Sequence, residues 1–278
     1  MDRSHRVTSR SQSTNARSVC AHALVGLIAV AGPAVAADPP ARAVAYDNVH
    51  IRVLDPAKAA AWYVSTLGAK PSEPPAPGTA QVTFGENVIT ITKGDTIVPS
   101  LNTLIDHIGL SYRDLDAAVK KAEAAGAKIT SAPRESPGIF RYAYIEDPWG
   151  IRIEMVEDTE RLGFHHVHLR VKDPAATLAW YAQQFGGEPA KLRGRLDGVR
   201  FGGVWVFAMS SGADQPAPPT AIQLVALRVS DVDVAMKGLA AAGVKTTAAP
   251  RSLPALRYAF VEDPNGIRVE VVTRTTTP

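Results

Sequence analysis

Two segments of this chain each occur twice, and this internal repeat constrains the fold more than any other feature of the sequence. The segment YDNVHIRVLDP at 46–56 returns as FHHVHLRVKDP at 164–174. The segment YAYIEDPWGIRIE at 142–154 returns as YAFVEDPNGIRVE at 258–270. Both pairs are displaced by nearly the same distance, and a period of this length exceeds one supersecondary unit. The sequence therefore predicts two related domains in tandem.

We expect these domains to span residues 44–157 and 162–274, and each divides again into two units of the same order. Alternating apolar residues predict an opening strand in each unit. In the first and third units Asp55 and Asp173 stand directly before a proline, the pattern of a helix N-cap followed by a first-turn proline. Shorter alternating segments follow each helix. The chain thus predicts an α+β fold made of four βαβββ units.

The first 36 residues predict an export signal. Four arginines precede an apolar run at 23–31, which is followed by the small-residue segment Ala-Val-Ala at 34–36. The run is shorter than the ~20 residues that cross a bilayer, which argues against a permanent anchor. We expect cleavage after Ala36, a periplasmic or secreted protein, and no membrane association after cleavage.

Charge and cysteine content narrow the possible partners and ligands. The chain has 30 Lys and Arg against 27 Asp and Glu; removing four arginines and Asp2 of the first 36 residues leaves 26 of each. A neutral body argues against a nucleic-acid partner. The only cysteine, Cys20, lies in the predicted signal. Metal ligands of the mature chain must therefore come from His, Asp and Glu.

Two Asp-Pro-x-Gly-x-x-x-Glu segments, at 147–154 and 263–270, occur together with a His on a strand that opens a unit. This combination resembles the vicinal oxygen chelate superfamily, which includes glyoxalase I, extradiol dioxygenases and bleomycin-binding proteins. The resemblance implies tandem domains in which two units pair and their curved mixed sheets form a cup around a divalent metal. It also implies that the ligands come from the opening strands and from the last strand.

Carried onto this chain, the resemblance gives His50, His107 and Glu154 as the metal ligands. Strand alternation supports the assignment, because His50 and Glu154 point away from their apolar neighbours. Two imidazoles and one carboxylate suit Fe(II), our first expectation, or Mn(II), Zn(II) or Ni(II), and leave open positions on the metal. The second domain departs from this pattern, since Leu224 stands where the first domain has His107.

Which units share a cup decides the ligand set. We favour pairing of consecutive units, which makes the second domain a degenerate copy. In some four-unit relatives the units pair across domains, and His168 would then replace His50. The two histidines at 165 and 166 lack matching positions in the repeat, and we interpret them as residues of a strand edge.

The resemblance implies a small-molecule substrate with two adjacent oxygens. Glyoxalase I uses a second carboxylate ligand, which the strands at 88–92 and 204–208 lack. An extradiol-type dioxygenase is therefore the first expectation, with Tyr144 donating a hydrogen bond to the substrate; its counterpart Phe260 cannot donate one. The alternatives are a glyoxalase-like lyase, a fosfomycin-type transferase, or a non-catalytic binding or resistance protein. We expect a monomer or a homodimer.

Overall fold

The computed structural model of the protein describes residues 38–211 and 219–275. The predicted export signal, residues 1–36, lies outside the described residues. No helix within the described ranges combines the length and the hydropathy needed to cross a membrane.

All four predicted βαβββ units are present. The first unit contains β1 (Ala43–Val53), α1 (Pro56–Leu67), β2 (Lys70–Ser72), β3 (Ala80–Phe84) and β4 (Asn87–Lys93). The second contains β5 (Ile105–Ser111), α2 (Leu115–Ala124), β6 (Lys128–Ser136), β7 (Phe140–Glu146) and β8 (Arg152–Val156). The third contains β9 (Gly163–Val171), α3 (Pro174–Phe185), β10 (Glu188–Leu192), β11 (Leu196–Phe201) and β12 (Val204–Ser210). The fourth contains β13 (Ile222–Val229), α4 (Val232–Ala241), β14 (Lys245–Leu253), β15 (Leu256–Glu262) and β16 (Arg268–Arg274).

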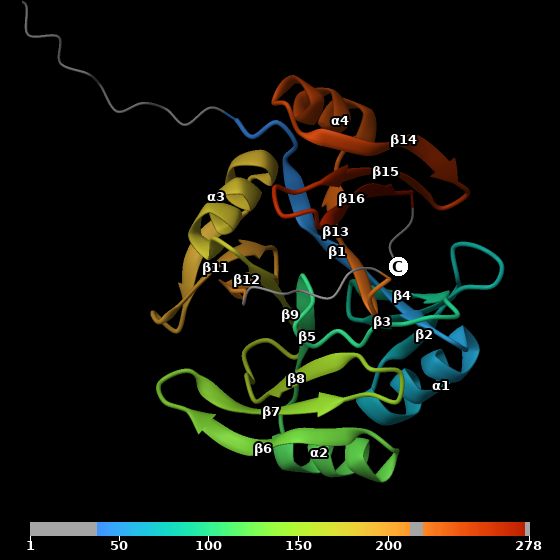
Figure 1. Ribbon diagram of the computed structural model, residues 1–278, viewed down its shortest axis with the longest axis vertical. Helices are drawn as coiled ribbons and strands as arrows, with labels where there is room; N and C mark the ends of the chain where they lie inside the picture. Colours follow the sequence, from blue (N-terminus) through green and yellow to red (C-terminus); the bar gives the residue numbers. More distant parts are fainter. Residues whose placement is uncertain (1–37, 212–218, 276–278) are drawn as a thin grey trace, which may run out of the picture. The chain divides into compact units, whose positions relative to one another are not determined.

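The units assemble into two mixed sheets of eight strands each (Figure 1). Sheet I has the order β14-β15-β16-β13-β1-β4-β3-β2 and joins the fourth unit to the first. Sheet II has the order β10-β11-β12-β9-β5-β8-β7-β6 and joins the third unit to the second. In each sheet the two opening strands are antiparallel neighbours, β1 with β13 and β5 with β9. The predicted α+β fold is confirmed.

The favoured pairing of consecutive units was wrong, because each sheet combines one unit from each repeat. Connection length explains the outcome. Only six residues, 157–162, join β8 to β9, whereas eleven residues, 94–104, join β4 to β5. Consecutive elements joined by short connections usually remain neighbours. The short link keeps β9 in the sheet of β8, and the longer link carries the chain from sheet I to sheet II.

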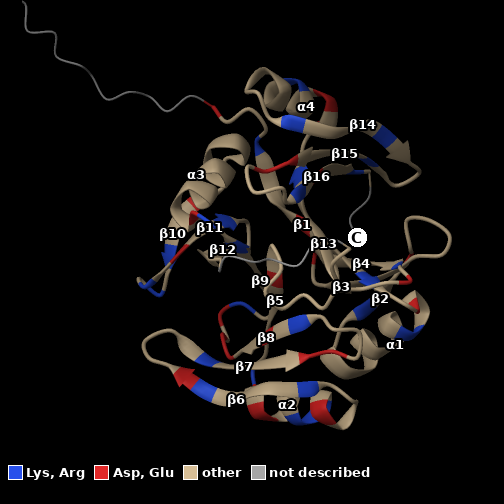
Figure 2. Cartoon of the chain, in the orientation of Figure 1, with Lys and Arg blue, Asp and Glu red and all other residues tan. Residues whose placement is uncertain are grey.

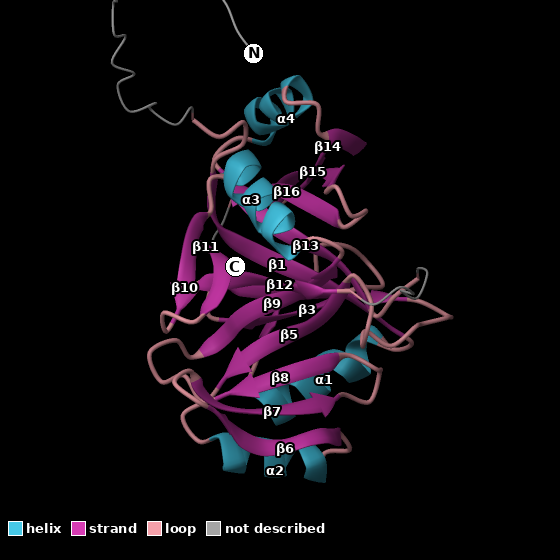
Figure 3. Cartoon of the chain, turned by 60° about the vertical axis from the view of Figure 1, so that its left-hand side comes forward, coloured by secondary structure: helices cyan, strands magenta, loops and turns pink. Residues whose placement is uncertain are grey.

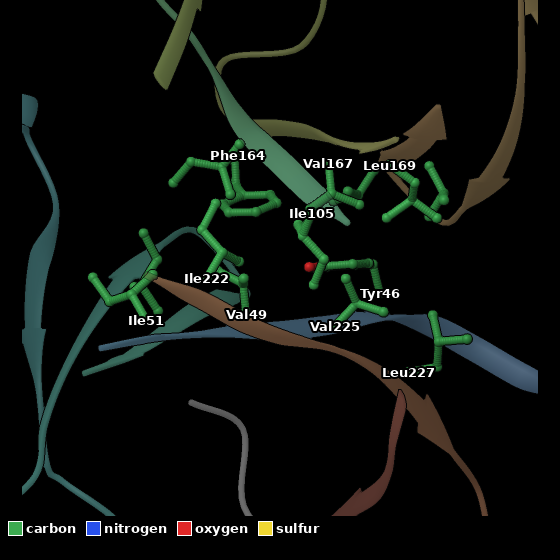
Figure 4. Close-up of a cluster of buried hydrophobic side chains, with 14 of the residues drawn as sticks. Tyr46, Val49, Ile51, Ile105, Phe164, Val167, Leu169, Ile222, Val225 and Leu227 are labelled. Carbon is green, nitrogen blue, oxygen red and sulfur yellow. The ribbon is translucent and has the colours of Figure 1, made fainter. Parts of the chain in front are cut away.

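Strand alternation separates an apolar face from a polar face in both sheets. Val49 and Ile51 of sheet I share a buried cluster with Ile105, Val167 and Leu169 of sheet II (Figure 4). Alternating side chains point to opposite faces of a strand, so the histidines that stand between these residues point away from the cluster. The two sheets thus pack against each other through their apolar faces. Their polar faces lie outside this core and can carry a functional site.

Helices α1 and α3 begin at the N-caps that the sequence predicts. The Asp55 carboxylate accepts a hydrogen bond from the Lys58 amide at the start of α1, and Gly68 ends that helix with a φ of 81°. Asp173 and Gly186 do the same for α3. In Figure 3, α2 and α4 lie beyond the outermost strands. Acidic and basic residues are interspersed along α2 (Figure 2), as the neutral charge balance predicts.

Candidate metal centre

The ladder between β5 and β9 contains a β-bulge at Asp106. Ile105 pairs with Leu169 and His107 pairs with His168, so Asp106 is an extra residue that has no partner across the ladder. A bulge changes the direction in which nearby side chains point, and bulges are frequent beside active sites. Here the Asp106 carboxylate accepts a 2.7 Å hydrogen bond from Nδ1 of His107.

A second bulge lies on the other strand of the same ladder. Gly109 pairs with His166 and Leu110 pairs with Phe164, which leaves His165 as the extra residue. Nδ1 of His165 shares a 2.8 Å hydrogen bond with Nδ1 of His166. The two bulges are thus related by the pseudo-symmetry of the sheet, and each supplies a partner for the histidine that follows it.

Four side chains converge on the polar face of sheet II, namely His107, Glu154, His166 and His168. Their possible ligand atoms all lie within 4.8 Å of one another. Oε2 of Glu154 lies 3.0 Å from Nε2 of His107 and 3.2 Å from Nε2 of His166. The strand β8, which carries Glu154, pairs in parallel with β5 and so places the carboxylate beside Gly109. Three imidazoles and one carboxylate form a donor set suited to Zn(II), Fe(II), Mn(II) or Ni(II).

Hydrogen bonds behind the cluster determine which ring nitrogens face it. Asp106 occupies Nδ1 of His107 and also forms an ion pair with Arg152. On the other side, Oδ2 of Asp158 lies 3.3 Å from Nε2 of His165. If His165 donates to Asp158 from Nε2–H, its Nδ1 accepts a hydrogen bond from Nδ1–H of His166. Both arrangements engage Nδ1 and leave Nε2 directed into the cluster, as second-shell partners do for metal-ligating histidines.

Gly109 provides the space in which the His166 ring lies. A Cβ atom at this position would come within 2.1 Å of Cε1 and Nδ1 of the ring. Glycine inside a strand commonly marks a close approach of this kind. The His166 ring can therefore occupy this position only because residue 109 of the neighbouring strand has no side chain.

The pKa shifts favour metal-binding protonation states. Burial raises the pKa of Glu154, but its contacts with His107 and His166 outweigh burial, and the net pKa is well below the ordinary value. Burial lowers the pKa of His166 to about 4, and burial with the charge of His107 lowers that of His168 as well. Burial opposes protonation of His107, but its hydrogen bonds to Asp106 and Glu154 raise its pKa overall. Near neutral pH the cluster offers the Glu154 carboxylate and the neutral imidazoles of His166 and His168, and a bound cation would displace the extra proton that the raised pKa favours on His107.

The residues fit a metal ion on geometric grounds. Nε2 of His166 is buried and has no hydrogen-bond partner, although Glu154 is only 3.2 Å away. Leaving a buried polar nitrogen unpaired is costly unless something else binds it. Ligand atoms on adjacent corners around a cation, with bonds of ~2.0 to 2.2 Å, lie about 3 Å apart. The separations of 3.0 and 3.2 Å around Oε2 of Glu154 match that spacing.

The structure brings together His107, Glu154 and His168 and separates them from His50. His50 lies in sheet I, where its Nε2 is 3.3 Å from Oε2 of Glu270. The prediction that His50 joins His107 was wrong because it assumed consecutive pairing. The alternative set with His168 has the observed geometry, and its role in binding a metal stays a prediction.

Sequence reasoning missed His166, which is buried and not at a strand edge. A signal was present. His107 stands seven residues before the helix N-cap Asp114, and His166 stands seven residues before the N-cap Asp173. Counting back from the N-caps identifies these two histidines as equivalent residues of the second and third units.

Tyr144 lies beside the cluster and lines a cavity of about 240 Å³. The cavity is also lined by Glu154, His166, His168 and Phe207, among other residues. The Tyr144 ring meets the His107 ring edge to face with centroids 5.3 Å apart, and the Arg152 guanidinium carbon lies 3.8 Å from the Tyr144 centroid. Burial and the charge of Glu154 raise the Tyr144 pKa, so its hydroxyl keeps its proton and can donate a hydrogen bond.

The equivalent place in sheet I has a different set of side chains. Asn48 stands at the position of His166 and donates hydrogen bonds to Asp47 at 2.8 Å and to Glu270 at 3.1 Å. Leu224 stands at the position of His107 and pairs with His50 in the ladder. With one imidazole and one carboxylate, this place lacks the donor set of sheet II.

Comparison with known proteins agrees with this architecture. A family model described as Glyoxalase/Bleomycin resistance protein/Dioxygenase superfamily matches residues 45–155 and 163–271. No curated protein matches the chain.

Several solved structures share the fold. Glyoxalase I from Zea mays superposes with a TM-score of 0.66 at 19% identity, covering 84% of this chain and 92% of that chain. A putative dioxygenase from Bacillus subtilis superposes with a TM-score of 0.65 at 18% identity, covering 85% and 87%. At these identities the likeness shows the fold alone.

Proposed function

The chain belongs to the Glyoxalase/Bleomycin resistance protein/Dioxygenase superfamily, and from this premise we propose that it is a metal-dependent enzyme acting on a small molecule with two adjacent oxygens. The observation that carries the proposal is the convergence of three histidines and Glu154 beside a cavity of about 240 Å³. His107, His166 and Glu154 would hold a divalent cation, with Fe(II) as the first candidate. When bound, such a cation polarises substrate oxygens and, as Fe(II), supports chemistry with dioxygen.

Extradiol-type ring cleavage is the first candidate reaction because the cavity suits an aromatic ring. Phe140, Tyr142 and Phe207 line it together with Ile139 and Leu196. These side chains would pack against the faces and edges of a catechol and exclude water from the reacting oxygens.

Two polar side chains would handle protons in this reaction. Tyr144 keeps its hydroxyl proton and would donate a hydrogen bond to one substrate oxygen. His168 is neutral near pH 7 because burial lowers its pKa, so a ring nitrogen of His168 would take the proton released by a substrate hydroxyl.

The second candidate is a glyoxalase-like lyase, and the closeness of His168 to the other three groups favours it. If His168 serves as a fourth ligand, four side chains would hold the cation, which would leave room for two substrate oxygens but not for dioxygen as well. Phe207 opposes this candidate. It stands at the position in β12 that is pseudo-symmetric to Glu154 in β8, where a second carboxylate would move a proton.

Metal content and oxygen uptake test the first candidate. We expect about one Fe(II) per chain after anaerobic reconstitution, catechol-dependent oxygen uptake, and a fall of about 100-fold or more in kcat for His168→Gln. His50→Gln is the matched control, because His50 holds the equivalent position in sheet I, and it should leave both measurements unchanged. Tight metal binding without oxygen uptake would reject ring cleavage and direct the assay to a hemithioacetal substrate, as the second candidate requires.

We also propose that residues 1–36 direct export. The apolar run at 23–31 and the small residues before Ala37 support this. Expression of the full chain in a bacterium, followed by sequencing of the exported protein, should give an N-terminus at Ala37. Retention of the whole chain in the cytoplasm would reject the proposal.

A further inference from the structure

Sheet I contains a cavity of about 280 Å³ that the metal chemistry does not use. It lies where the polar face of sheet I meets the starts of β5 and β13. Two guanidinium groups, those of Arg52 and Arg268, line it together with the Gln223 amide. Leu104, Ile222 and Ile267 contribute apolar walls. The cavity thus combines two positive charges with a hydrocarbon surface.

The equivalent groups of sheet II show what the sheet I cavity lacks. There, the Asp106 carboxylate pairs with Arg152 at 2.5 Å and lies 3.9 Å from Arg170. Gln223 stands at the bulge position of Asp106, and Arg268 and Arg52 stand at the positions of Arg152 and Arg170. Replacing a carboxylate by an amide at this position leaves the two arginines of sheet I facing a neutral group.

Neither guanidinium forms an ion pair with a carboxylate among residues 38–211 and 219–275. Arg268 stacks on Phe260, with its guanidinium carbon 3.6 Å from the ring centroid. When the Gln223 amide is oriented so that its oxygen faces Arg52, which satisfies both ends of the amide, Arg52 donates to this oxygen from Nε and Nη2 at 3.0 and 2.5 Å, and the amide nitrogen donates to Thr92 at 2.8 Å. A guanidinium carries five N–H donors, so Arg52 keeps donors for a further acceptor.

The stem of Arg52 is held in place by its surroundings. A Cβ atom at Gly94 would lie 2.3 Å from Cδ of Arg52, so the absence of a side chain at Gly94 makes room for the arginine. Stacking holds Arg268, and packing against Gly94 holds Arg52. Two fixed arginines in one cavity are suited to bidentate recognition of a planar anion.

We propose that this cavity binds a small organic carboxylate with an apolar body. The carboxylate would accept hydrogen bonds from Arg52 and Arg268 and would supply the negative charge that Asp106 supplies in sheet II. The apolar body would lie against Leu104, Ile222 and Ile267. A volume of about 280 Å³ is at the lower end for ligand pockets, which limits the ligand to about the size of one aromatic ring.

Calorimetric titration of the purified metal-loaded protein with benzoate tests the proposal. Benzamide has the same shape without the charge, and acetate has the charge without the ring. We expect each to bind at least about tenfold more weakly than benzoate. Equal affinity for benzamide would overturn the role of the arginines, and equal affinity for acetate would overturn the role of the apolar wall.

Two variants test whether benzoate binds in the cavity of sheet I. Arg268→Gln removes one donor group, and Gln223→Asp supplies the internal carboxylate that sheet II already has; each should weaken benzoate binding at least about tenfold. Arg257→Gln is the control, since Arg257 lies in the same unit, pairs with Asp233 and does not line the cavity. The Gln223→Asp protein is expected to fold well because it copies a native arrangement. Benzoate that binds at the metal centre would keep its affinity in both variants, and this result would overturn the proposal.

Discussion

The polar faces of sheet I and sheet II are built from equivalent units, yet among the described residues only sheet II gathers four candidate metal ligands. Four substitutions account for most of the difference. From sheet II to sheet I the pairs are His107 and Leu224, His166 and Asn48, Asp106 and Gln223, and Gly109 and Ala226. Both sheets keep the same strand order, and the two bulges of the β5–β9 ladder recur in the β1–β13 ladder. The fold therefore does not depend on these side chains, and the site is added to a scaffold that forms without it.

The groups behind the two faces differ in charge. In sheet II, Asp158 lies beside His165, which in turn contacts a candidate ligand. In sheet I, Asp47 stands at the bulge position of His165 and is held by Arg228 and by Arg274, each at 2.7 Å. One sheet has an imidazole that orients a candidate metal ligand, and the other has a buried ion-pair network that holds its strands together.

Replacing His107 by the leucine of sheet I should have the largest effect. His107→Leu removes an imidazole from the cluster and should weaken metal binding at least about 100-fold. This effect is larger than the typical effect of removing a residue that only hydrogen-bonds a metal ligand. Metal content after dialysis, with competition against a chelator, measures this effect. The reverse change, Asn48→His with Leu224→His and Ala226→Gly, should give sheet I a measurable metal affinity. Unchanged metal content in His107→Leu would contradict the site in sheet II.

Asp47→Asn tests the ion-pair network of sheet I. Burial raises the Asp47 pKa, but hydrogen bonds and charge from Arg274, with bonds from Asn48 and Arg228, make the net pKa lower than usual. Breaking a buried pair of this kind should lower the free energy of unfolding by about 3 kcal/mol at pH 7. A carboxyl with a depressed pKa stabilises the fold above the unfolded value of about 3.9 and loses this effect as pH falls through the folded value.

Urea denaturation at pH 7 and pH 3 should therefore show a large difference between wild type and Asp47→Asn at the higher pH and a smaller one at the lower. His165→Asn is the matched change in sheet II, and it should cost about 1 kcal/mol because it removes contacts with Asp158 and His166 and leaves no buried arginine unpaired. A greater cost for His165→Asn than for Asp47→Asn would contradict the contrast between the two networks.

Gly109→Ala transfers the alanine of sheet I into sheet II. The new Cβ would meet the His166 ring at 2.1 Å, so the ring or a strand must move. We expect a loss of about 2 kcal/mol in the free energy of unfolding, together with weaker metal binding. Ala226→Gly in sheet I should cost no more than about 1 kcal/mol. Equal effects of the two changes on metal content would show that Gly109 does not position His166.

Asp106→Gln should give the smallest effect. The amide oxygen of the new glutamine still accepts a hydrogen bond from Nδ1 of His107. The negative charge of Asp106, which makes Nε2 of this imidazole more basic and a stronger metal ligand, is lost. We expect metal affinity to fall about tenfold, the lower end for an outer-shell change. Chelator competition measures the loss, and Gln223→Asn in sheet I is the control. An unchanged affinity would mean that Asp106 acts only on Arg152.

Local features of the fold could be predicted from the sequence. The alternation of apolar and polar residues predicted the opening strands, and the N-cap residues Asp55 and Asp173 predicted where α1 and α3 begin. The sequence also predicted that His107 and Glu154 lie close together, because both belong to the second unit, in which β5 pairs with β8. His50 was misplaced because choosing its partner unit requires a contact between distant parts of the chain.

The sequence by itself determined the repeat, the four βαβββ units and the family, because strand alternation and helix caps depend on residues close together in the chain. Only the tertiary structure decided which units share a sheet and which histidines meet. A bulge adds one residue to a strand, and one residue reverses the face to which a side chain points. The bulge at His165 allows Phe164 to join the apolar cluster while His166 stays on the polar face, and Gly109 leaves space for the His166 ring. Both features depend on the pairing of β9 with β5.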